Sequence, residues 1–131
     1  MTFAEAIKSG FQNYVGFTGR AARSEFWWWH LFLLLVYFAF IILVLLLSHP
    51  PDVPGGLIGI FLLVVLALFL PTLAILIRRL HDLNLSGWWS LLEFIPIVNS
   101  VGIIWLLAWC SLRGTVGPNR FGADPLSPPA T

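Results

Sequence analysis

One uninterrupted apolar segment, residues 26–47, constrains this chain more than any other feature. It reads FWWWHLFLLLVYFAFIILVLLL and contains no lysine, arginine, aspartate or glutamate. As a helix with a rise of about 1.5 Å per residue it would be about 33 Å long, which matches a bilayer core of roughly 30 Å. A buried helix of a soluble protein is the alternative, but the run exceeds the roughly 18 residues that mark a spanning helix. The segment therefore predicts a transmembrane helix.

The composition of the whole chain supports a membrane location. Hydrophobic residues make up 59% of the 131 residues and charged residues only 10%, whereas soluble domains carry about 25% charged residues. The formal net charge of +1 provides no basic surface for a nucleic acid. The single cysteine and three scattered histidines suggest neither a disulfide nor a metal site, and we expect no cofactor.

A second apolar segment, residues 57–77, follows a loop rich in proline and glycine over residues 48–56. It contains Pro71, which lacks a backbone N–H and leaves one helix carbonyl without its usual donor. We expect Thr72 or a neighbouring helix to supply that donor. The pattern predicts a second transmembrane helix, and the pair Arg78–Arg79 follows it directly.

A third apolar stretch, residues 88–112, is less regular. Glu93 lies inside it, and Pro96, Asn99 and Gly102 interrupt its middle. Two interpretations stay open: a re-entrant hairpin of two short helices, which must bury its non-helical backbone in protein or water, or a plain third span.

The amino-terminal region, residues 2–15, predicts an amphipathic helix that begins with a Thr2–Glu5 capping box. Its apolar side chains recur at helical spacing at Phe3, Ile7, Phe11 and Tyr14. This helix either rests in the headgroup layer or packs on its own chain. Ser24 is placed to cap the first span.

The distribution of positive charge predicts the orientation, because basic residues favour the cytoplasmic side. The loop between the two spans contains no lysine or arginine, so it should face the opposite side. The amino terminus and the loop after the second span should be cytoplasmic, and a re-entrant third stretch would also place the tail, residues 113–131, there. All seven basic residues lie outside the spans: Lys8, Arg20, Arg23, Arg78, Arg79, Arg113 and Arg120.

The same orientation gathers most of the charge at one membrane face. We select eight candidate site residues there: Arg20, Arg23, Glu25, Arg78, Arg79, His81, Asp82 and Arg120. Tryptophans that suit the interface adjoin them, with Trp27, Trp28, Trp88 and Trp89 as the expected anchors.

Two interpretations of this cluster are compatible. One is an internal ion-pair network, in which Arg78 pairs with Asp82 and Glu25 with Arg79. The other is a site for an anionic lipid headgroup or a small anion, because the arginine fork binds phosphate oxygens in pairs. His81–Asp82 lacks a nucleophile beside it, so we do not expect an enzyme.

Three sequence motifs resemble those of the DUF805 family, small bacterial inner-membrane proteins of unknown function. They are FTGRAARSEFW at residues 17–27, RRLHD followed by SGWW at residues 78–89, and GPNRFGADP at residues 117–125. Their order and spacing match, although Asn84–Leu85 replaces a pair that often carries a cation in the family. The resemblance implies a bacterial inner-membrane location and supplies no reaction.

The sequence thus predicts an all-α, multi-pass membrane protein in which residues 1–131 form a single membrane domain. The leading hypothesis is a non-catalytic module that binds anionic lipid headgroups or a small anion. The alternatives are a structural subunit or assembly partner of another membrane protein, and a homo-oligomeric transporter or channel with Glu93 in its path.

Overall fold

The computed structural model describes residues 1–49, 52–95 and 99–127, without the side chains of Glu93 and Asn99. Within these residues the protein is all-helical, as predicted. The helices are α1 (Phe3–Gln12), α2 (Arg23–Leu47), α3 (Gly55–Asp82), the 3-10 helix η1 (Gly87–Phe94) and α4 (Asn99–Ser111).

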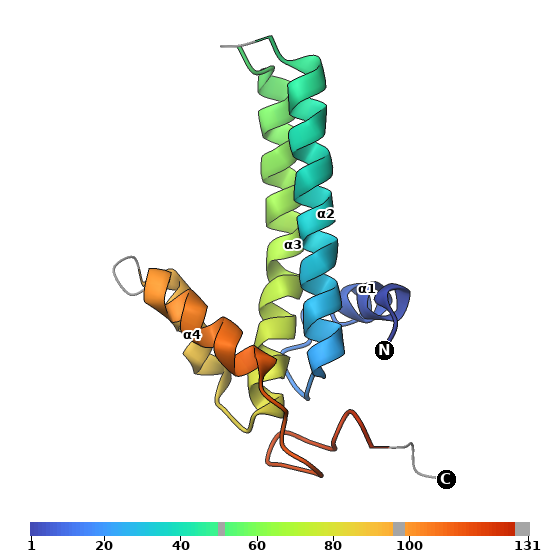
Figure 1. Cartoon of the computed structure of the whole chain (residues 1–131), viewed down its shortest axis with the longest axis vertical. Coiled ribbons are helices and arrows are strands. Elements are labelled where there is room, and N and C mark those ends of the chain that lie inside the picture. The colour runs from blue at the N-terminus through green and yellow to red at the C-terminus, as the bar shows by residue number, and fades with distance from the viewer. Residues whose placement is uncertain (50–51, 96–98, 128–131) are drawn as a thin grey trace.

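Helices α2 and α3 form one long antiparallel hairpin (Figure 1). Of the described helices, these two are long and apolar enough to cross a membrane, with mean hydropathies of 3.0 and 3.1 over their most apolar windows. Only 6% and 28% of those windows are buried inside the protein. A core helix of a soluble protein would be mostly buried, so these exposed apolar surfaces require an apolar solvent.

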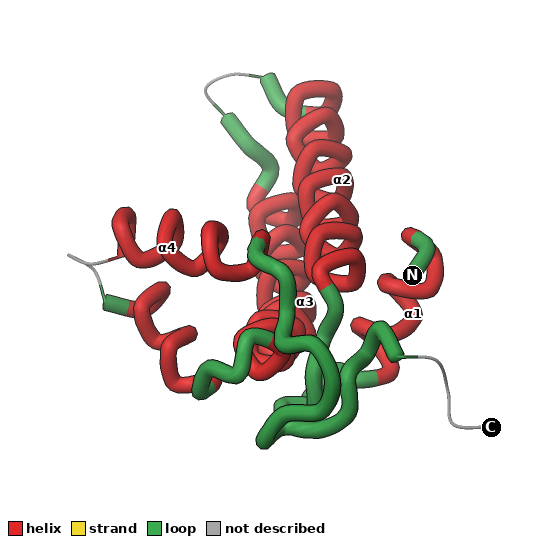
Figure 2. The backbone as a smooth tube through the Cα atoms, turned by 60° about the horizontal axis from the view of Figure 1, so that its bottom comes forward, coloured by secondary structure: helices red, strands yellow, loops and turns green. Residues whose placement is uncertain are grey.

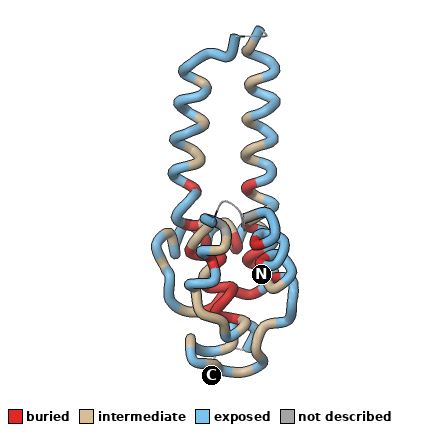
Figure 3. Tube along the Cα trace, turned by 90° about the vertical axis from the view of Figure 1, so that its left-hand side faces the viewer, coloured by how far each residue is buried: buried red, intermediate tan, exposed pale blue. Residues whose placement is uncertain are grey.

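Burial is confined to one end of the hairpin (Figure 3). We call it the charged end, where α2 begins at Arg23 and α3 ends at Asp82. Trp29, Phe26, Ile75 and Leu80 are at most 1% exposed there. The other half of the hairpin presents leucine, isoleucine and phenylalanine to its surroundings.

The ends of both long helices extend beyond the apolar segments that predict them. Helix α3 continues through Arg78 and Arg79 to Asp82, so both arginines are helical residues. Helix α2 begins at Arg23, and Ala22 occupies its N-cap without a side-chain hydrogen bond. The expectation that Ser24 caps this helix is wrong, because Ser24 already lies in the first turn.

Pro71 lies inside α3, and the helix runs through it without interruption. The carbonyl of Ala67, four residues earlier, accepts a hydrogen bond from the Tyr14 hydroxyl. The Thr72 hydroxyl instead donates to Leu68 O at 2.6 Å and accepts from Trp29 Nε1 at 3.0 Å. The donor that proline removes is therefore supplied from outside α3, by the segment that follows α1.

Helix α1 packs on its own chain, against the beginning of α2 (Figure 1). The predicted capping box is present, with Glu5 N donating to Thr2 Oγ1 at 3.2 Å and Thr2 N donating to Glu5 Oε2 at 2.8 Å. The Phe11 ring meets Trp29 edge-on at 5.4 Å between centroids. Since the helix ends at Gln12, Tyr14 is free to reach across to α3.

Helix α1 approaches α2 closely at Gly10, where it contacts Trp29. An alanine there should therefore lower stability, which is opposite to the effect expected from helix propensity alone. A Cβ at Gly10 would overlap the indole of Trp29, so Gly10→Ala should destabilise the protein by about 1–3 kcal/mol. The control is Gly59→Ala in α3, where a Cβ meets nothing within 4 Å and alanine should stabilise by up to about 1 kcal/mol. Thermal unfolding in detergent measures both. A Gly10→Ala variant that is more stable than the wild type would contradict this packing.

The third apolar stretch runs out from α3 and returns to it, as η1 and α4 (Figures 1 and 2). The return is anchored at the charged end, where Arg79 Nε donates to Cys110 O at 3.0 Å. Helix α4 has 13 residues, about 20 Å at the usual rise, which is less than a bilayer core of roughly 30 Å. The predicted break at Pro96, and the side chains of Glu93 and Asn99, lie outside the described part.

Candidate functional site

Six of the eight candidate residues are buried together at the charged end. We call them the buried charge cluster: Arg20, Glu25, Arg78, Arg79, His81 and Asp82, all at most 8% exposed. The other two candidates, Arg23 and Arg120, are exposed. Exposed arginines interact with solvent or ligand, whereas buried ones need partners within the protein.

Arg79 is the centre of the cluster, with none of its surface exposed. Its guanidinium pairs with Asp82, one turn further along α3. It also donates to Cys110 O at 3.0 Å, to Ala21 O at 3.3 Å and to Leu112 O. The carbonyls at the end of α4 have no intrahelical donors, so Arg79 caps α4 and holds it to α3 and to the segment before α2.

Asp82 is shared between two arginines. Its Oδ1 lies 2.8 Å from Arg20 Nη2, and its Oδ2 pairs with Arg79. Its backbone carbonyl accepts from Thr115 N at 2.7 Å. Gly114 leaves room for this contact, because a Cβ there would overlap the Asp82 carboxylate.

Arg20 connects Asp82 to the tail. Its Nη1 donates to Gly117 O at 2.6 Å and its Nη2 to Thr115 O. One arginine fork thus holds a carboxylate of α3 and the turn that follows α4, which accounts for the burial of Arg20.

Arg78 faces the other way, toward α2. Its Nη1 lies 3.0 Å from Glu25 Oε1, and that oxygen also accepts from the Ser9 hydroxyl of α1 at 2.8 Å. The predicted pairs, Arg78 with Asp82 and Glu25 with Arg79, are therefore exchanged. Helical spacing allows Asp82 either partner. The direction of the neighbouring helices decides, because α2 approaches Arg78 while α4 ends over Arg79.

His81 and Asp82 are adjacent but bond to different partners, so they do not form a base and its orienting acid. His81 Nδ1 donates to Gly19 O at 2.9 Å. Its ring stacks on Phe121 with centroids 3.9 Å apart and planes 4° apart. Asn119 Nδ2 donates to His81 O at 2.8 Å. The tail therefore contacts both the ring and the backbone carbonyl of His81.

Asp124 organises the tail itself. Its carboxylate accepts from Gly117 N and from Leu126 N, each at 2.9 Å. These backbone donors, Leu126 first and then Gly117, hold the pKa of Asp124 below its ordinary value. Arg120 lies outside this arrangement: it donates to Asn84 O at 3.2 Å and covers the Phe121 ring at 4.7 Å.

A pocket of about 280 Å³ opens beside the buried charge cluster. We call it the arginine pocket. Arg79 and Asp82 form its inner wall, and Arg23 and Arg113 lie on its rim. Arg113 forms no hydrogen bond or ion pair with the described residues, and Arg23 makes only a long contact of 3.4 Å to Ser111 O. Sequence reasoning used Arg113 for orientation and missed it as a site residue, although it directly follows the third stretch.

The four expected tryptophan anchors are exposed, from 37% at Trp28 to 78% at Trp88. Trp29, between them in sequence, is instead fully buried and bonds to Thr72. The exposed four lie next to the buried charge cluster in sequence, at the beginning of α2 and in η1. Their position agrees with an interfacial role.

Comparison with known proteins identifies the family. A profile described as "Protein of unknown function (DUF805)" matches residues 14–123. The chain belongs to the DUF805 family. The inner membrane protein YhaI of Escherichia coli (strain K12) is 42% identical over 117 residues, which cover 89% of this chain and 92% of YhaI. The inner membrane protein YhaH of the same organism is 38% identical over 114 residues, covering 87% and 90%. No solved structure matches the chain significantly.

The predicted family is therefore confirmed, and the chain is a helical inner-membrane protein. The three DUF805-like motifs, distant in sequence, meet in the buried charge cluster. The first contributes Arg20 and Glu25, the second contributes Arg78 to Asp82, and the third wraps around them through Gly117, Asn119 and Phe121.

Proposed function

We propose that this inner-membrane protein is a non-catalytic module that binds one anionic group, a lipid phosphate or a small soluble anion, in the arginine pocket. The observation that carries the proposal is the charge balance of that pocket. Three arginines line it against one carboxylate, Asp82, and that carboxylate is already paired with Arg20 and Arg79.

The guanidinium groups that could bind a ligand are those of Arg23 and Arg113, on the rim of the pocket. Both are exposed, and among the described residues neither has a carboxylate partner. Arginine suits phosphate because its planar fork donates two parallel hydrogen bonds. Arg23 and Ser24 also form the first turn of α2, where the helix dipole favours negative charge.

This site is narrower than the eight residues that the sequence suggests. Arg20 and Arg79 direct their donors at carboxylates and carbonyls of the protein. Arg78 pairs with Glu25 through Nη1, while its Nε and Nη2 have no hydrogen-bond partner among the described residues. All three side chains are buried, so they act as scaffold. The ion-pair network and the anion site therefore have different roles: the network is a buried scaffold whose Arg79 and Asp82 form the inner wall of the pocket, and the exposed Arg23 and Arg113 on the rim would bind the anion.

The test is native mass spectrometry of the protein released from lipid that contains phosphatidylglycerol and cardiolipin. The double variant Arg23→Gln/Arg113→Gln should retain at least about tenfold less anionic phospholipid, because hydrogen bonds to charged groups contribute about 1.5–3 kcal/mol each. The matched control, Lys8→Gln/Arg120→Gln, removes two positive charges outside the pocket. The adduct mass separates a phospholipid from inorganic phosphate added to the sample.

Equal retention by both double variants would refute a defined pocket and indicate general attraction to the surface. The same spectra address the alternative of an assembly partner. A stoichiometric complex or a defined homo-oligomer would support that alternative.

The proposed orientation places the charged end in the cytoplasm. Six of the seven basic residues lie at or near that end, and the loop between α2 and α3 has none. The tail contacts α3 through Arg20 and Thr115, so it lies on the same side as the end of α3. We expect a green fluorescent protein fused after Thr131 to fluoresce and alkaline phosphatase there to be inactive. The reverse pattern would overturn the orientation or the re-entrant third stretch. The same two reporters inserted at residues 52–54 serve as the control for the outer side.

A further inference from the structure

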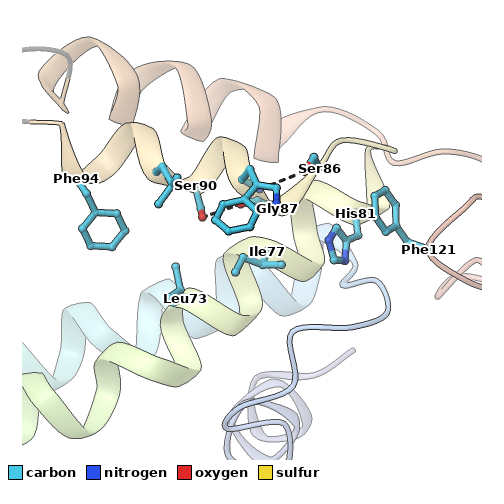
Figure 4. Close-up of a pocket in the computed structure, with 10 residues that line it drawn as sticks. Leu73, Ile77, His81, Ser86, Gly87, Ser90, Phe94 and Phe121 are labelled. Atoms are coloured by element: carbon cyan, nitrogen blue, oxygen red, sulfur yellow. Dashed lines mark hydrogen bonds between the residues drawn. The ribbon is translucent and has the colours of Figure 1, made fainter.

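A second pocket, on the opposite side of α3 from α2, changes from apolar to polar along its length (Figure 4). It lies between α3 and η1 and has a volume of about 440 Å³. We call it the graded pocket, and its wall includes Leu73, Ile77, His81, Ser86, Phe94 and Phe121. It shares no lining residue with the arginine pocket.

The gradient follows from helical spacing. Leu73, Ile77 and His81 are four residues apart, so they lie above one another on one face of α3. The facing helix η1 runs antiparallel to α3, with its N-cap Ser86 near His81 and its last residue Phe94 near Leu73 (Figure 4). The apolar part of the pocket therefore points toward the exposed half of the hairpin, and its polar part lies at the charged end.

One polar atom at the polar end has no partner. His81 is 8% exposed, and its Nδ1 donates to Gly19 O. In a neutral imidazole this leaves Nε2 as a bare acceptor, and no described residue donates to it. Nε2 faces Gly87, where a Cβ would lie 3.4 Å from it. A glycine here keeps the approach to the histidine open.

The neighbouring serine supplies the complementary group. Ser86 Oγ accepts from Trp88 N at 3.3 Å, so its hydroxyl hydrogen stays available. An acceptor on His81 and a donor on Ser86 together recognise a hydroxyl, which donates to one and accepts from the other.

We infer that the graded pocket binds an uncharged single-chain lipid whose head carries a hydroxyl group, such as a monoacylglycerol or a long-chain alcohol. The chain lies along Leu73, Ile77 and Phe94, and the hydroxyl meets His81 Nε2 and Ser86 Oγ. The volume lies in the lower part of the roughly 300–1,000 Å³ range of small-molecule pockets, which fits one chain better than two.

The experiment is native mass spectrometry of the full-length protein in detergent, with monoolein, methyl oleate or oleate added at equal concentration. The three share one chain and differ in the head. We expect monoolein to be retained about tenfold more than methyl oleate, because the ester has no hydroxyl to donate to His81 Nε2. Equal retention of the two, or a preference for oleate, overturns recognition of a hydroxyl.

Two variants locate the binding. Leu73→Trp fills the apolar end from α3, and Leu91→Trp fills the pocket from η1; both should abolish retention of monoolein. The matched control, Leu66→Trp, places the same residue on α3 at a position that is 68% exposed and outside the pocket. Retention by both filled variants overturns the assignment. The double variant Arg23→Gln/Arg113→Gln should still bind monoolein, so the two pockets can fail independently.

Discussion

Arg79→Ala is expected to destabilise the protein by about 3–5 kcal/mol, the usual effect of breaking a buried ion pair. The substitution removes four donors at once, because Arg79 bonds to Asp82 and to the carbonyls of Ala21, Cys110 and Leu112. It leaves the last carbonyls of α4 without partners in a buried site, where each unsatisfied group carries a penalty of about 1–3 kcal/mol. Arg79→Lys should recover little, since a single ammonium group cannot reproduce the fork.

Thermal unfolding in detergent, followed by the fraction of monodisperse protein, measures this effect. Arg113→Ala is the matched control, because it removes an exposed arginine from the same end of the hairpin and should change stability by less than about 0.5 kcal/mol. If the two variants unfold at the same temperature, Arg79 is not the centre of the buried charge cluster. The expected loss also makes Arg79→Ala unsuitable for testing ligand binding, which is why that test uses Arg23 and Arg113.

Arg20→Ala should release the tail from the charged end. Arg20 bonds to Asp82 and to the carbonyls of Thr115, Gly117 and Gly122. Without it, Asp82 keeps Arg79, but the turn around Gly117 loses its donor. We expect a loss of about 3–5 kcal/mol, as for other buried pairs, and faster cleavage of residues 113–127 by added protease.

Arg20→Lys separates the two roles of this side chain. It keeps a positive charge for Asp82 but presents one compact head instead of a fork, so stability should recover in part while the tail stays sensitive to protease. Arg120→Lys is the control, because Arg120 is exposed and bonds to a single carbonyl. Tail cleavage that is equally slow in wild type, Arg20→Lys and Arg20→Ala would show that Arg20 does not hold the tail.

Features that depend on residues a few positions apart, such as helix caps, could be predicted from the sequence. The Thr2–Glu5 capping box formed as expected because its two partners are three residues apart on one turn. The partner of the carbonyl freed by Pro71 could not be predicted in the same way. Tyr14 reaches Ala67 across 53 positions of sequence, and no local pattern indicates such a contact.

The pairing within the buried charge cluster shows the same limit. Charge and position indicated that Arg20, Glu25, Arg78, Arg79 and Asp82 would meet at one end of the spans. Which arginine takes which acid depends on the angle at which α2 and α4 approach α3. Nothing in the sequence marks Gly114 as part of the site. The structure shows why a glycine is needed there: the Asp82 carboxylate occupies the space that a Cβ would fill.

The sequence by itself determined the membrane location, the two long helices and the family, because the hydrophobic effect and chain length act through composition and continuous runs. The tertiary structure alone decided that Arg20, Arg78 and Arg79 are buried and paired with carboxylates of the protein, and that Arg23 and Arg113 lie exposed beside a pocket without a carboxylate partner among the described residues. The physical reason is that a guanidinium group takes the nearest carboxylates and carbonyls, and which groups are nearest is set by helix packing and not by sequence order.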